Sequence, residues 1–439
     1  MKITPVTTSS ASCTIVSSPS KAVEASHELR KEPVNSDEVR VNNALPYFPD
    51  VGVLALVPDE WGGPWQLRQY VLTRLAQYFQ VVWCDPPLWW RKWWQHLSPQ
   101  NGNVDGAPFT GSSFTIYHPV KHLPEIGRPR LLARWTEKER LRRARRILLD
   151  KGCTKIILYL WRPQYETALD LINYDLSCYH IDDEYTFSEV EQPTTDQERR
   201  LIERVDQVFI HSPALLEKKG KLNPHTLFVP NGVDYLAYAT PNPVPEDLAI
   251  IPHPRIGYVG RIKEQLDLSL LVNLAQRHPQ WSFIMVGPQG NFDRQASLIE
   301  KLSQLPNVYF LGAKPLTALP AYTQHLDVCM LCYKLNDYTK FIYPMKLHEY
   351  LASGRPVVGS PIRSLQEFAH VVKLACTVDE WSEAIRDSLS PAAISAEQVE
   401  ARRSIARQQD WDRLVARIVD SLCKQIGPVS WNVSRSVTP

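Results

Sequence analysis

Short, continuous apolar runs recur along the chain, and segments with apolar residues at three- and four-residue spacing separate them. Runs without polar alternation are typical of strands that a parallel sheet buries on both faces. We expect such strands at residues 51–57, 81–84, 155–161, 177–181, 205–212, 255–260, 281–286, 307–311, 327–331, 356–358 and 371–375. The segments between them predict crossover helices, so the expected fold class is α/β with doubly wound parallel sheets.

Polar and proline-rich stretches divide this pattern into two domains. Residues 1–45 are rich in Ser, Thr, Lys and Glu without periodicity, which predicts a disordered tail. Prolines recur between residues 239 and 254 and predict a stiff linker there. The expected organisation is therefore a first domain at 46–238, the linker at 239–254, a second domain at 255–426 and a polar tail at 427–439.

The most informative stretch is residues 344–361. Pro344 suits the start of a helix, because the first helical amide needs no intrahelical acceptor. Gly354 supplies the left-handed conformation that ends a helix. One apolar face lies between them and consists of Leu347, Tyr350 and Leu351. The buried strand at 356–358 follows at once, which is the helix-to-strand step of a doubly wound sheet.

Two charged residues of this predicted helix suit a nucleotide. In doubly wound sheets, helix N-termini point at the crevice beyond the strand ends and bind phosphate there. Lys346 would supply a cation for the phosphates, and Glu349, almost one turn further, a carboxylate for a ribose diol. The alternative interpretation is a surface helix with a solvated Lys and a solvated Glu.

Residues 344–358 resemble the signature P-x-K-x-x-E-Y-L-A-x-G-x-P-V-V of retaining GT-B glycosyltransferases, which transfer sugars from nucleotide donors. The subgroup related to teichuronic-acid glycosyltransferases resembles this chain most. The resemblance implies two Rossmann-like domains that face a cleft, with a C-terminal helix that crosses back to the first domain. It also implies that Glu349 binds the donor ribose. Phe341 stands where many members carry a second Glu that contacts the donor sugar, and the subgroup shows the same departure.

Further residues of the second domain resemble the donor-phosphate site of that family. Arg261 and Lys263 follow the first strand of this domain, where a pair of cations would neutralise a diphosphate. They resemble the family's G-R-x-x-K clamp, although the family's spacing to the Lys is longer. The loop at 333–343, which includes Thr339, would wrap the donor phosphates.

Two short motifs of the first domain fit the same resemblance. Residues 230–234 read Pro-Asn-Gly-Val-Asp and match the step that closes the first domain in the family. Gly62 and Gly63 follow the first strand, where a glycine pair in the family lets the backbone approach donor phosphate and acceptor. The alternative for this pair is an ordinary tight turn.

A histidine and a run of carboxylates follow another predicted strand of the first domain. His180 precedes Asp182, Asp183 and Glu184 at the strand's carboxyl end, where α/β proteins bind ligands. The position resembles the Y-x-x-x-D-[DE] step of the subgroup. By this resemblance, Asp183 would orient or partly deprotonate an acceptor hydroxyl, and His180 would hydrogen-bond the transferred sugar or the acceptor. The alternative is a capping carboxylate pair beside a structural histidine.

Two segments combine tryptophan with basic residues. Residues 89–94 hold four tryptophans, namely Trp89, Trp90, Trp93 and Trp94, and residues 128–148 hold nine Arg or Lys against two Glu. Tryptophan with basic residues favours the interface of an anionic membrane. This predicts peripheral contact with the cytoplasmic face of the inner membrane, where a lipid-linked acceptor would lie. The alternative is a solvated basic helix, with the tryptophans in an acceptor cleft or in packing.

Composition sets the remaining bounds. The chain is 44% hydrophobic and 22% charged with a net charge of +2, which is typical of a globular protein with no polyanionic partner such as a nucleic acid. No apolar run approaches the roughly 20 residues that span a bilayer, and no secretory signal pattern is present, so a cytoplasmic location is expected. Cys329 and Cys332 are spaced C-x-x-C in a strand-like run without a second ligand pair, which favours a buried strand over a metal site.

The sequence thus predicts a hexosyltransferase, with retention implied by the family. It would use a UDP- or GDP-linked sugar and a glycan or lipid-linked glycan acceptor in cell-surface or exopolysaccharide biosynthesis, with no cofactor and no metal. Two alternatives stay open at this point. One is a sugar-nucleotide epimerase on the same fold, and the other is a non-catalytic binding protein, which the Phe341 departure would suit.

Overall fold

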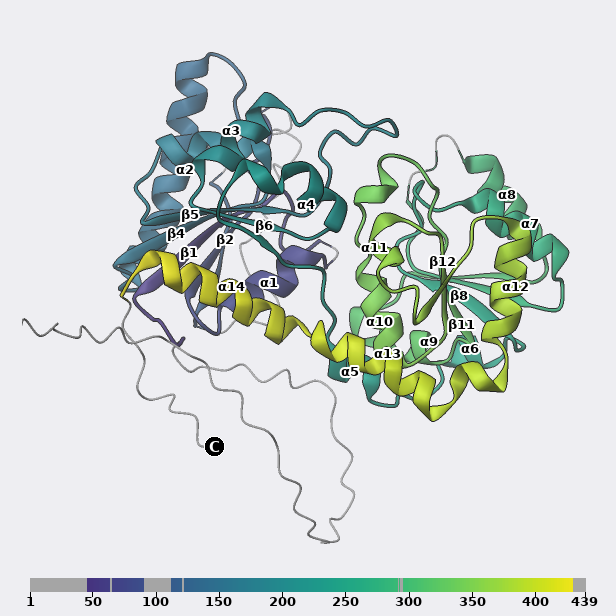
Figure 1. Cartoon of the computed structure of the whole chain (residues 1–439). Coiled ribbons are helices and arrows are strands. Elements are labelled where there is room, and N and C mark those ends of the chain that lie inside the picture. The colour runs from purple at the N-terminus through teal and green to yellow at the C-terminus, as the bar shows by residue number, and fades with distance from the viewer. Residues whose placement is uncertain are drawn as a thin grey trace, which may run out of the picture. The chain divides into compact units, whose positions relative to one another are not determined.

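The computed structural model describes residues 46–63, 65–90, 112–120, 122–290, 292 and 295–428 (Figure 1). Within these residues the chain forms a seven-stranded and a six-stranded parallel sheet, each flanked by helices. This confirms the predicted α/β class with two doubly wound domains. The predicted tail at 1–45 and most of the tail at 427–439 lie outside the described residues.

The first sheet runs in the order β3-β2-β1-β4-β5-β6-β7. Its strands are β1 (Val51–Leu56), β2 (Gln80–Cys84), β3 (Phe114–Tyr117), β4 (Lys155–Leu160), β5 (Leu176–Ile181), β6 (Gln207–Ile210) and β7 (Thr226–Phe228). All six residues of the central strand β1 are buried, as a strand covered on both faces requires. The chain starts at the centre and winds outward in both directions, which is Rossmann topology.

Helices cover both faces of this sheet. They are α1 (Leu67–Leu75), α2 (Arg130–Asp150), α3 (Asp196–Arg204) and α4 (Pro213–Lys219), with the 3₁₀ helices η2 (Pro163–Asp170) and η3 (Gly220–Leu222). One hydrophobic cluster joins α1 to the sheet, and another joins α2, α3 and α4 to it. The two faces of the sheet therefore have separate cores.

The second sheet runs in the order β10-β9-β8-β11-β12-β13. Its strands are β8 (Arg255–Val259), β9 (Ser282–Val286), β10 (Val308–Gly312), β11 (Val328–Leu331), β12 (Val357–Gly359) and β13 (Val372–Leu374). Its longer helices are α7 (Leu268–Arg277), α8 (Ala296–Gln304), α10 (Met345–Ser353), α12 (Val378–Ser388) and α13 (Ala396–Gln408). Shorter helices are α5 (Tyr235–Ala239), α6 (Glu246–Ala249), α9 (Leu319–Gln324), α11 (Arg363–Gln366), η4 (Leu316–Ala318), η5 (Thr339–Phe341) and η6 (Pro391–Ile394).

The last helix, α14 (Trp411–Ile426), packs on the first domain rather than on the second. Its apolar face contains Trp411, Leu414 and Ile418, which belong to the same cluster as β1 and α1. The ring of Trp411 stacks on that of Tyr70 at a centroid distance of 5.4 Å. The predicted return of the C-terminal helix to the first domain is thereby confirmed.

Two features differ from what the hydrophobic pattern alone indicates. The edge strands β3 and β7 were not predicted: only Phe114 of the four residues of β3 is buried, and none of the three residues of β7 is. Leu248 and Ile251, inside the proline-rich stretch predicted as a linker, lie buried in the core of the second domain. Among the described helices, none is both long and apolar enough to cross a bilayer.

Candidate active site

Helix α10 stands where residues 344–361 predicted a helix followed by a strand. Pro344 caps its N-terminus, and Gly354 ends it in the left-handed conformation with φ 76°. Its predicted apolar residues Leu347, Tyr350 and Leu351 are fully buried. The hydroxyl of Tyr350 accepts a 2.8 Å hydrogen bond from the amide of Val259, at the carboxyl end of β8. The helix is therefore fixed against the strand end where doubly wound sheets bind ligands.

Lys346 and Glu349 lie together at this end of the sheet. Nζ of Lys346 is 5.2 Å from the ring centre of Tyr258, which favours the cation. Burial lowers the pKa of Lys346 to about 8, and Glu349 opposes that shift. Burial likewise raises the pKa of Glu349, while Lys346 and a hydrogen bond from Tyr238 hold it down. The pair thus offers one cation and one carboxylate, as the spacing predicted.

A glycine at the end of β8 makes room for Lys346. Gly260 has φ 141°, and a Cβ atom there would overlap Cε and Nζ of Lys346. Gly287 has φ 136°, and a Cβ atom there would overlap the carbonyl oxygen of Gly260. Both positions need glycine for conformation and for space. Sequence reasoning missed this pair, although a Gly directly after each of two neighbouring strands was a usable signal.

Two more cations reach the same region from the loop after β8. Arg261 and Lys263 are both exposed. The protein around Lys263 lowers the pKa of its ammonium group; Arg261 adds to the effect, and Asp183 opposes it. Lys263 also lowers the pKa of Lys346. The structure therefore brings together four of the predicted donor residues, Arg261, Lys263, Lys346 and Glu349.

Asp183, in the loop after β5, interacts electrostatically with Lys263 of this group. It accepts a 3.0 Å hydrogen bond from the hydroxyl of Tyr338. Burial raises the pKa of Asp183 to about 6; Asp182 adds to the rise, and Tyr338 opposes it. A carboxyl group that titrates near neutral pH is suited to acid–base work on a hydroxyl. Tyr338 was not among the predicted site residues.

The raised pKa gives a testable pH dependence. A carboxyl that prefers its neutral form in the folded state costs stability once it ionises. This cost is absent below its unfolded pKa of about 3.9 and is complete above its folded pKa of about 6. We expect Asp183→Asn to raise the free energy of unfolding by about 1 kcal/mol at pH 7 and to have no such effect at pH 3.5. Urea unfolding at both pH values measures this, and an equal change at both would contradict it.

His180 lies in the core of the first domain, whereas its place beside the carboxylates in the sequence predicted contact with the transferred sugar or the acceptor. It is fully buried in β5, and its ring stacks on Trp161 at 4.3 Å. Its Nδ1 shares a 2.8 Å hydrogen bond with the hydroxyl of Tyr159. Burial lowers the pKa of His180 to about 3, so the ring is neutral at physiological pH. Its surroundings are those of a core histidine, and it has no surface on which an acceptor could lie.

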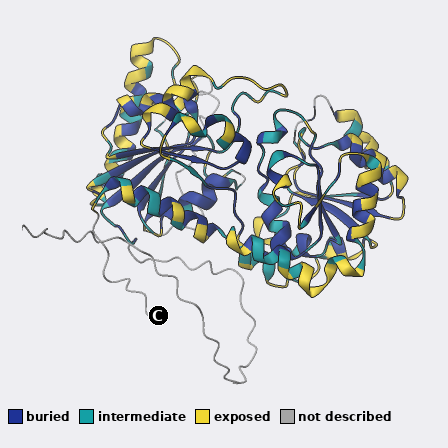
Figure 2. Cartoon of the chain, in the orientation of Figure 1, coloured by how far each residue is buried: buried dark blue, intermediate teal, exposed yellow. Residues whose placement is uncertain are grey.

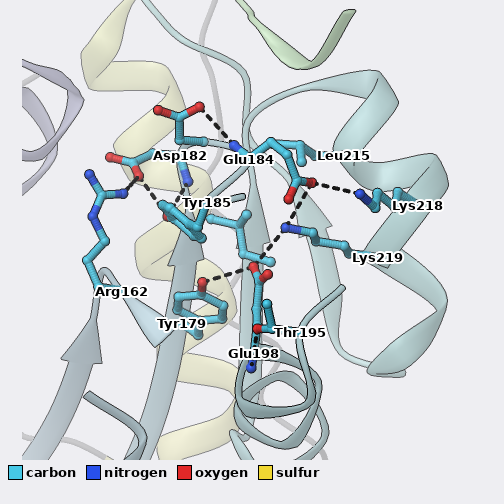
Figure 3. A network of polar contacts seen from close by, with 12 residues as sticks. Arg162, Tyr179, Asp182, Glu184, Tyr185, Thr195, Glu198, Leu215, Lys218 and Lys219 are labelled. Atoms are coloured by element: carbon cyan, nitrogen blue, oxygen red, sulfur yellow. Dashed lines mark hydrogen bonds and ion pairs between the residues drawn. The ribbon is translucent and has the colours of Figure 1, made fainter. Parts of the chain in front are cut away.

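A buried charge network supports the loop that carries Asp183. Asp182 accepts hydrogen bonds from Arg68 and Arg162, and from the hydroxyl of Tyr185 at 2.8 Å. Figure 3 shows Arg162, Asp182 and Tyr185 together, beside a second group of charges formed by Glu184, Glu198, Lys218 and Lys219. Burial would raise the pKa of Asp182, but Arg68 and Arg162 lower it below its ordinary value. Two adjacent aspartates thereby differ, since Asp182 stays ionised while Asp183 titrates near pH 6.

The remaining predicted residues have more local roles. The hydroxyl of Thr339 is buried and donates to the carbonyl of Lys334 at 2.6 Å, so it is used inside its own loop. Gly63 donates its amide to the carbonyl of Glu60 at 3.1 Å, and Gly62 is exposed, which describes a tight turn. Phe341 is buried in a cluster with residues of the first domain, where a Glu would lack that packing.

Comparison with known proteins gives four consistent likenesses. Residues 253–390 match the family model described as Glycosyl transferases group 1. Over 240 residues the chain is 30% identical to the putative teichuronic acid biosynthesis glycosyltransferase TuaH of Bacillus subtilis (strain 168). That match covers 51% of this chain and 58% of TuaH, so the chain spans little more than half the length of this relative.

Two solved structures share the fold at low sequence identity. One is a trehalose-6-phosphate protein from E. coli bound with UDP-2-fluoro glucose, with 13% identity, 86% of this chain and 99% of that chain covered, and a TM-score of 0.60. The other is a glycosyltransferase from Rickettsia africae ESF-5, with 10% identity, 86% and 98% covered, and a TM-score of 0.61. These likenesses concern the architecture, which is that of GT-B proteins. The chain accordingly has the GT-B fold, and residues 253–390 of its second domain are similar to the glycosyl transferases group 1 family.

Proposed function

We propose that this protein is a glycosyltransferase that moves a hexosyl group from a nucleotide sugar to a glycan or lipid-linked glycan. The observation that carries the proposal is the grouping of Arg261, Lys263, Lys346 and Glu349 at the carboxyl end of the second sheet. The two named glycosyltransferases among its relatives support transfer over the epimerase and the non-catalytic alternatives.

The grouping suits a nucleoside diphosphate as the leaving group. Glu349 offers a carboxylate that accepts two hydroxyl hydrogen bonds from a ribose diol. Lys346, Lys263 and Arg261 offer positive charge to the two phosphates, where negative charge develops as the sugar departs. In this proposal the side chains supply that charge without a metal ion. The E. coli structure with UDP-2-fluoro glucose makes UDP the first base to test and GDP the second.

The acceptor would be activated from the first domain. Asp183 has the pKa of a group that can receive a proton from a hydroxyl near pH 6. We place it at the acceptor, and we place His180 in the core beneath as a residue that shapes the strand end. Retention at the transferred carbon is part of the proposal through the family. So are a role in cell-surface polysaccharide synthesis, which the name of TuaH suggests, and work at the cytoplasmic face of a membrane.

Ligand-dependent stability of Glu349→Gln tests the donor site. The full-length protein is melted with UDP, GDP, ADP, CMP and dTDP sugars in turn. A ligand present at about a hundred times its dissociation constant stabilises the wild type by about 2.7 kcal/mol. We expect one nucleotide to do so and Glu349→Gln to lose most of the effect, because the ribose contact is gone.

Glu383→Gln is the matched control, since Glu383 is an exposed residue of α12. We expect this variant to respond to the nucleotide as the wild type does. Stabilisation of Glu349→Gln equal to that of the wild type would remove Glu349 from the donor site. Absence of stabilisation by every nucleotide would count against the proposed function as a whole.

A further inference from the structure

The first turns of α2 expose large apolar side chains. Leu131 is 86% exposed, Trp135 is 58% exposed and Leu132 is 42% exposed. The buried side of this helix consists of Thr136, Leu141, Ala144 and Leu148, further along its length. Figure 2 shows α2 mostly exposed at its start, with buried residues alternating with exposed ones further along the helix. A large part of the surface of these apolar side chains is therefore left uncovered by the described part of the domain.

Two more tryptophans lie against the segment that leads into α2. Trp89 is 38% exposed and Trp90 is 49% exposed. The amide of Trp90 donates to the carbonyl of Glu125 at 3.1 Å, and Glu125 donates its amide to the carbonyl of Leu88 at 2.8 Å. Residues 123 and 124 are tied to α2 in turn, because Arg140 donates to both of their carbonyls. Arg140 is nine positions, or about 180° around the helix, from Leu131, so these contacts hold the two tryptophans beside α2 without placing them on the face of Leu131.

Cations surround these apolar side chains. At 100° per residue, Leu131 and Trp135 share the outer face of α2 with Lys138 and Arg142. Arg130 and Arg134 flank that face, and all of these cations are exposed. Among the ion pairs between described residues, Arg143 pairs with Glu139 and Arg146 with Asp150, but Arg130, Arg134, Lys138 and Arg142 take part in none. The net charge of the whole chain is only +2, so this positive face is local.

We infer that this surface docks the first domain on an anionic lipid bilayer. We call it the α2 patch and define it as Leu131, Leu132 and Trp135 with the cations Arg130, Arg134, Lys138 and Arg142. Trp and Leu on one helix face favour the boundary between headgroups and acyl chains, and Arg and Lys beside them favour acidic headgroups. Tryptophan is enriched at this depth because its ring is apolar and its N–H is polar.

Charge complementarity favours an anionic bilayer, rather than a second copy of this chain, as the partner of the α2 patch. Two identical patches would bring the same four cations face to face, and such a contact is repulsive. A bilayer of acidic lipids instead offers negative charge over the whole area and an apolar layer beneath it. The inference deepens the proposed function, because a lipid-linked acceptor lies in such a membrane, but it stands on contacts and exposure in the first domain alone.

Vesicle co-sedimentation of the full-length protein tests the α2 patch without donor or acceptor. The probes are vesicles of phosphatidylcholine alone and of equal parts phosphatidylcholine and phosphatidylglycerol. We expect binding to the mixed vesicles that weakens as salt is raised, and at most weak binding to the neutral ones. Arg130→Glu/Arg134→Glu/Lys138→Glu is expected to lower the partition coefficient more than about tenfold. Leu131→Ser/Trp135→Ser is expected to lower it and to remove the shift in tryptophan emission on binding.

Two controls separate the patch from general effects. Ile250→Ser removes an apolar side chain that is 84% exposed in the second domain, and Arg413→Glu reverses an exposed charge on α14. Both should bind vesicles as the wild type does, and all variants should keep the wild-type melting temperature and nucleotide response. Equal binding to both kinds of vesicle, no binding to either, or equal loss in a control would overturn the inference. A wild-type dimer that Leu131→Ser/Trp135→Ser converts to a monomer would do so as well. A normal nucleotide response with no vesicle binding would leave the proposed function standing.

Discussion

Gly260→Ala is expected to abolish measurable binding of the nucleotide sugar. The new methyl group would occupy the space that the end of the Lys346 side chain now fills. Lys346 must then leave its position over the Tyr258 ring, and the donor phosphates lose a cation. We expect affinity to fall at least a hundredfold, because a hydrogen bond between charged groups and the shape of the loop are lost together. Isothermal titration calorimetry with the stabilising nucleotide measures the change.

Gly312→Ala is the control that shows the effect of backbone strain without the displacement of Lys346. Gly312 also has a positive φ, of 69°, but a Cβ atom there meets nothing within 4 Å. Both substitutions should cost about 1–3 kcal/mol of stability through strain, whereas only Gly260→Ala should lose the ligand. Lys346→Ala in the Gly260→Ala background should recover some stability without recovering affinity. Wild-type affinity in Gly260→Ala would show that Lys346 can bind from another position, and the geometric account would be wrong.

Arg68→Met is expected to be among the most destabilising single substitutions in the first domain. Arg68 is 1% exposed and donates to the carboxylates of Asp182 and Asp59. Its loss leaves Asp182 buried with Arg162 as its remaining cation. Breaking a buried ion pair from one side costs about 3–5 kcal/mol, because the other charge stays desolvated. Denaturant unfolding of the variant at pH 7 checks this.

The destabilisation should depend on pH in a defined direction. The folded state lowers the pKa of Asp182, so the stabilisation it supplies is present above its unfolded pKa of about 3.9 and is lost as the pH falls through its folded pKa. The difference between wild type and Arg68→Met should therefore shrink under acid. Arg74→Met, on the same helix α1, removes a partner of the largely exposed Asp412 and should cost less than about 1 kcal/mol. Similar losses of stability in Arg68→Met and Arg74→Met would mean that the buried network around Asp182 stabilises the fold no more than a surface ion pair does.

The sequence predicted the strands and α10 well because their physical causes are local. Continuous apolar runs report burial on two faces, and they located every strand of the second sheet. Gly354 marked the end of α10 because only a left-handed residue suits that position. β3 and β7 were not predicted, because they lack the continuous apolar run that marked the other strands, and at most one residue of each is buried.

Features of the site that depend on tertiary contact were harder to predict. Lys346 and Glu349 lie together because their spacing on one helix is fixed by geometry. His180 seemed equally placed by sequence, but β5 is buried on both faces, so His180 lies in the core while Asp183 lies in the loop beyond. Arg68 sits among apolar residues of α1, and only the fold shows that its partner is Asp182. The difference in pKa between Asp182 and Asp183 likewise follows from burial and from neighbours that are distant in sequence.

The return of α14 to the first domain has a consequence for synthesis on the ribosome. Residues 411–426 complete a core that begins near residue 48, and the whole second domain is translated between the two. Tyr70 and the neighbouring apolar face of the first sheet therefore stay uncovered by Trp411 until the second domain has been translated. Domains usually mature in the order in which they are translated, but here the domain that is begun first is finished last. A chain that ends before residue 411 would have every strand of the second domain but an unfinished core in the first.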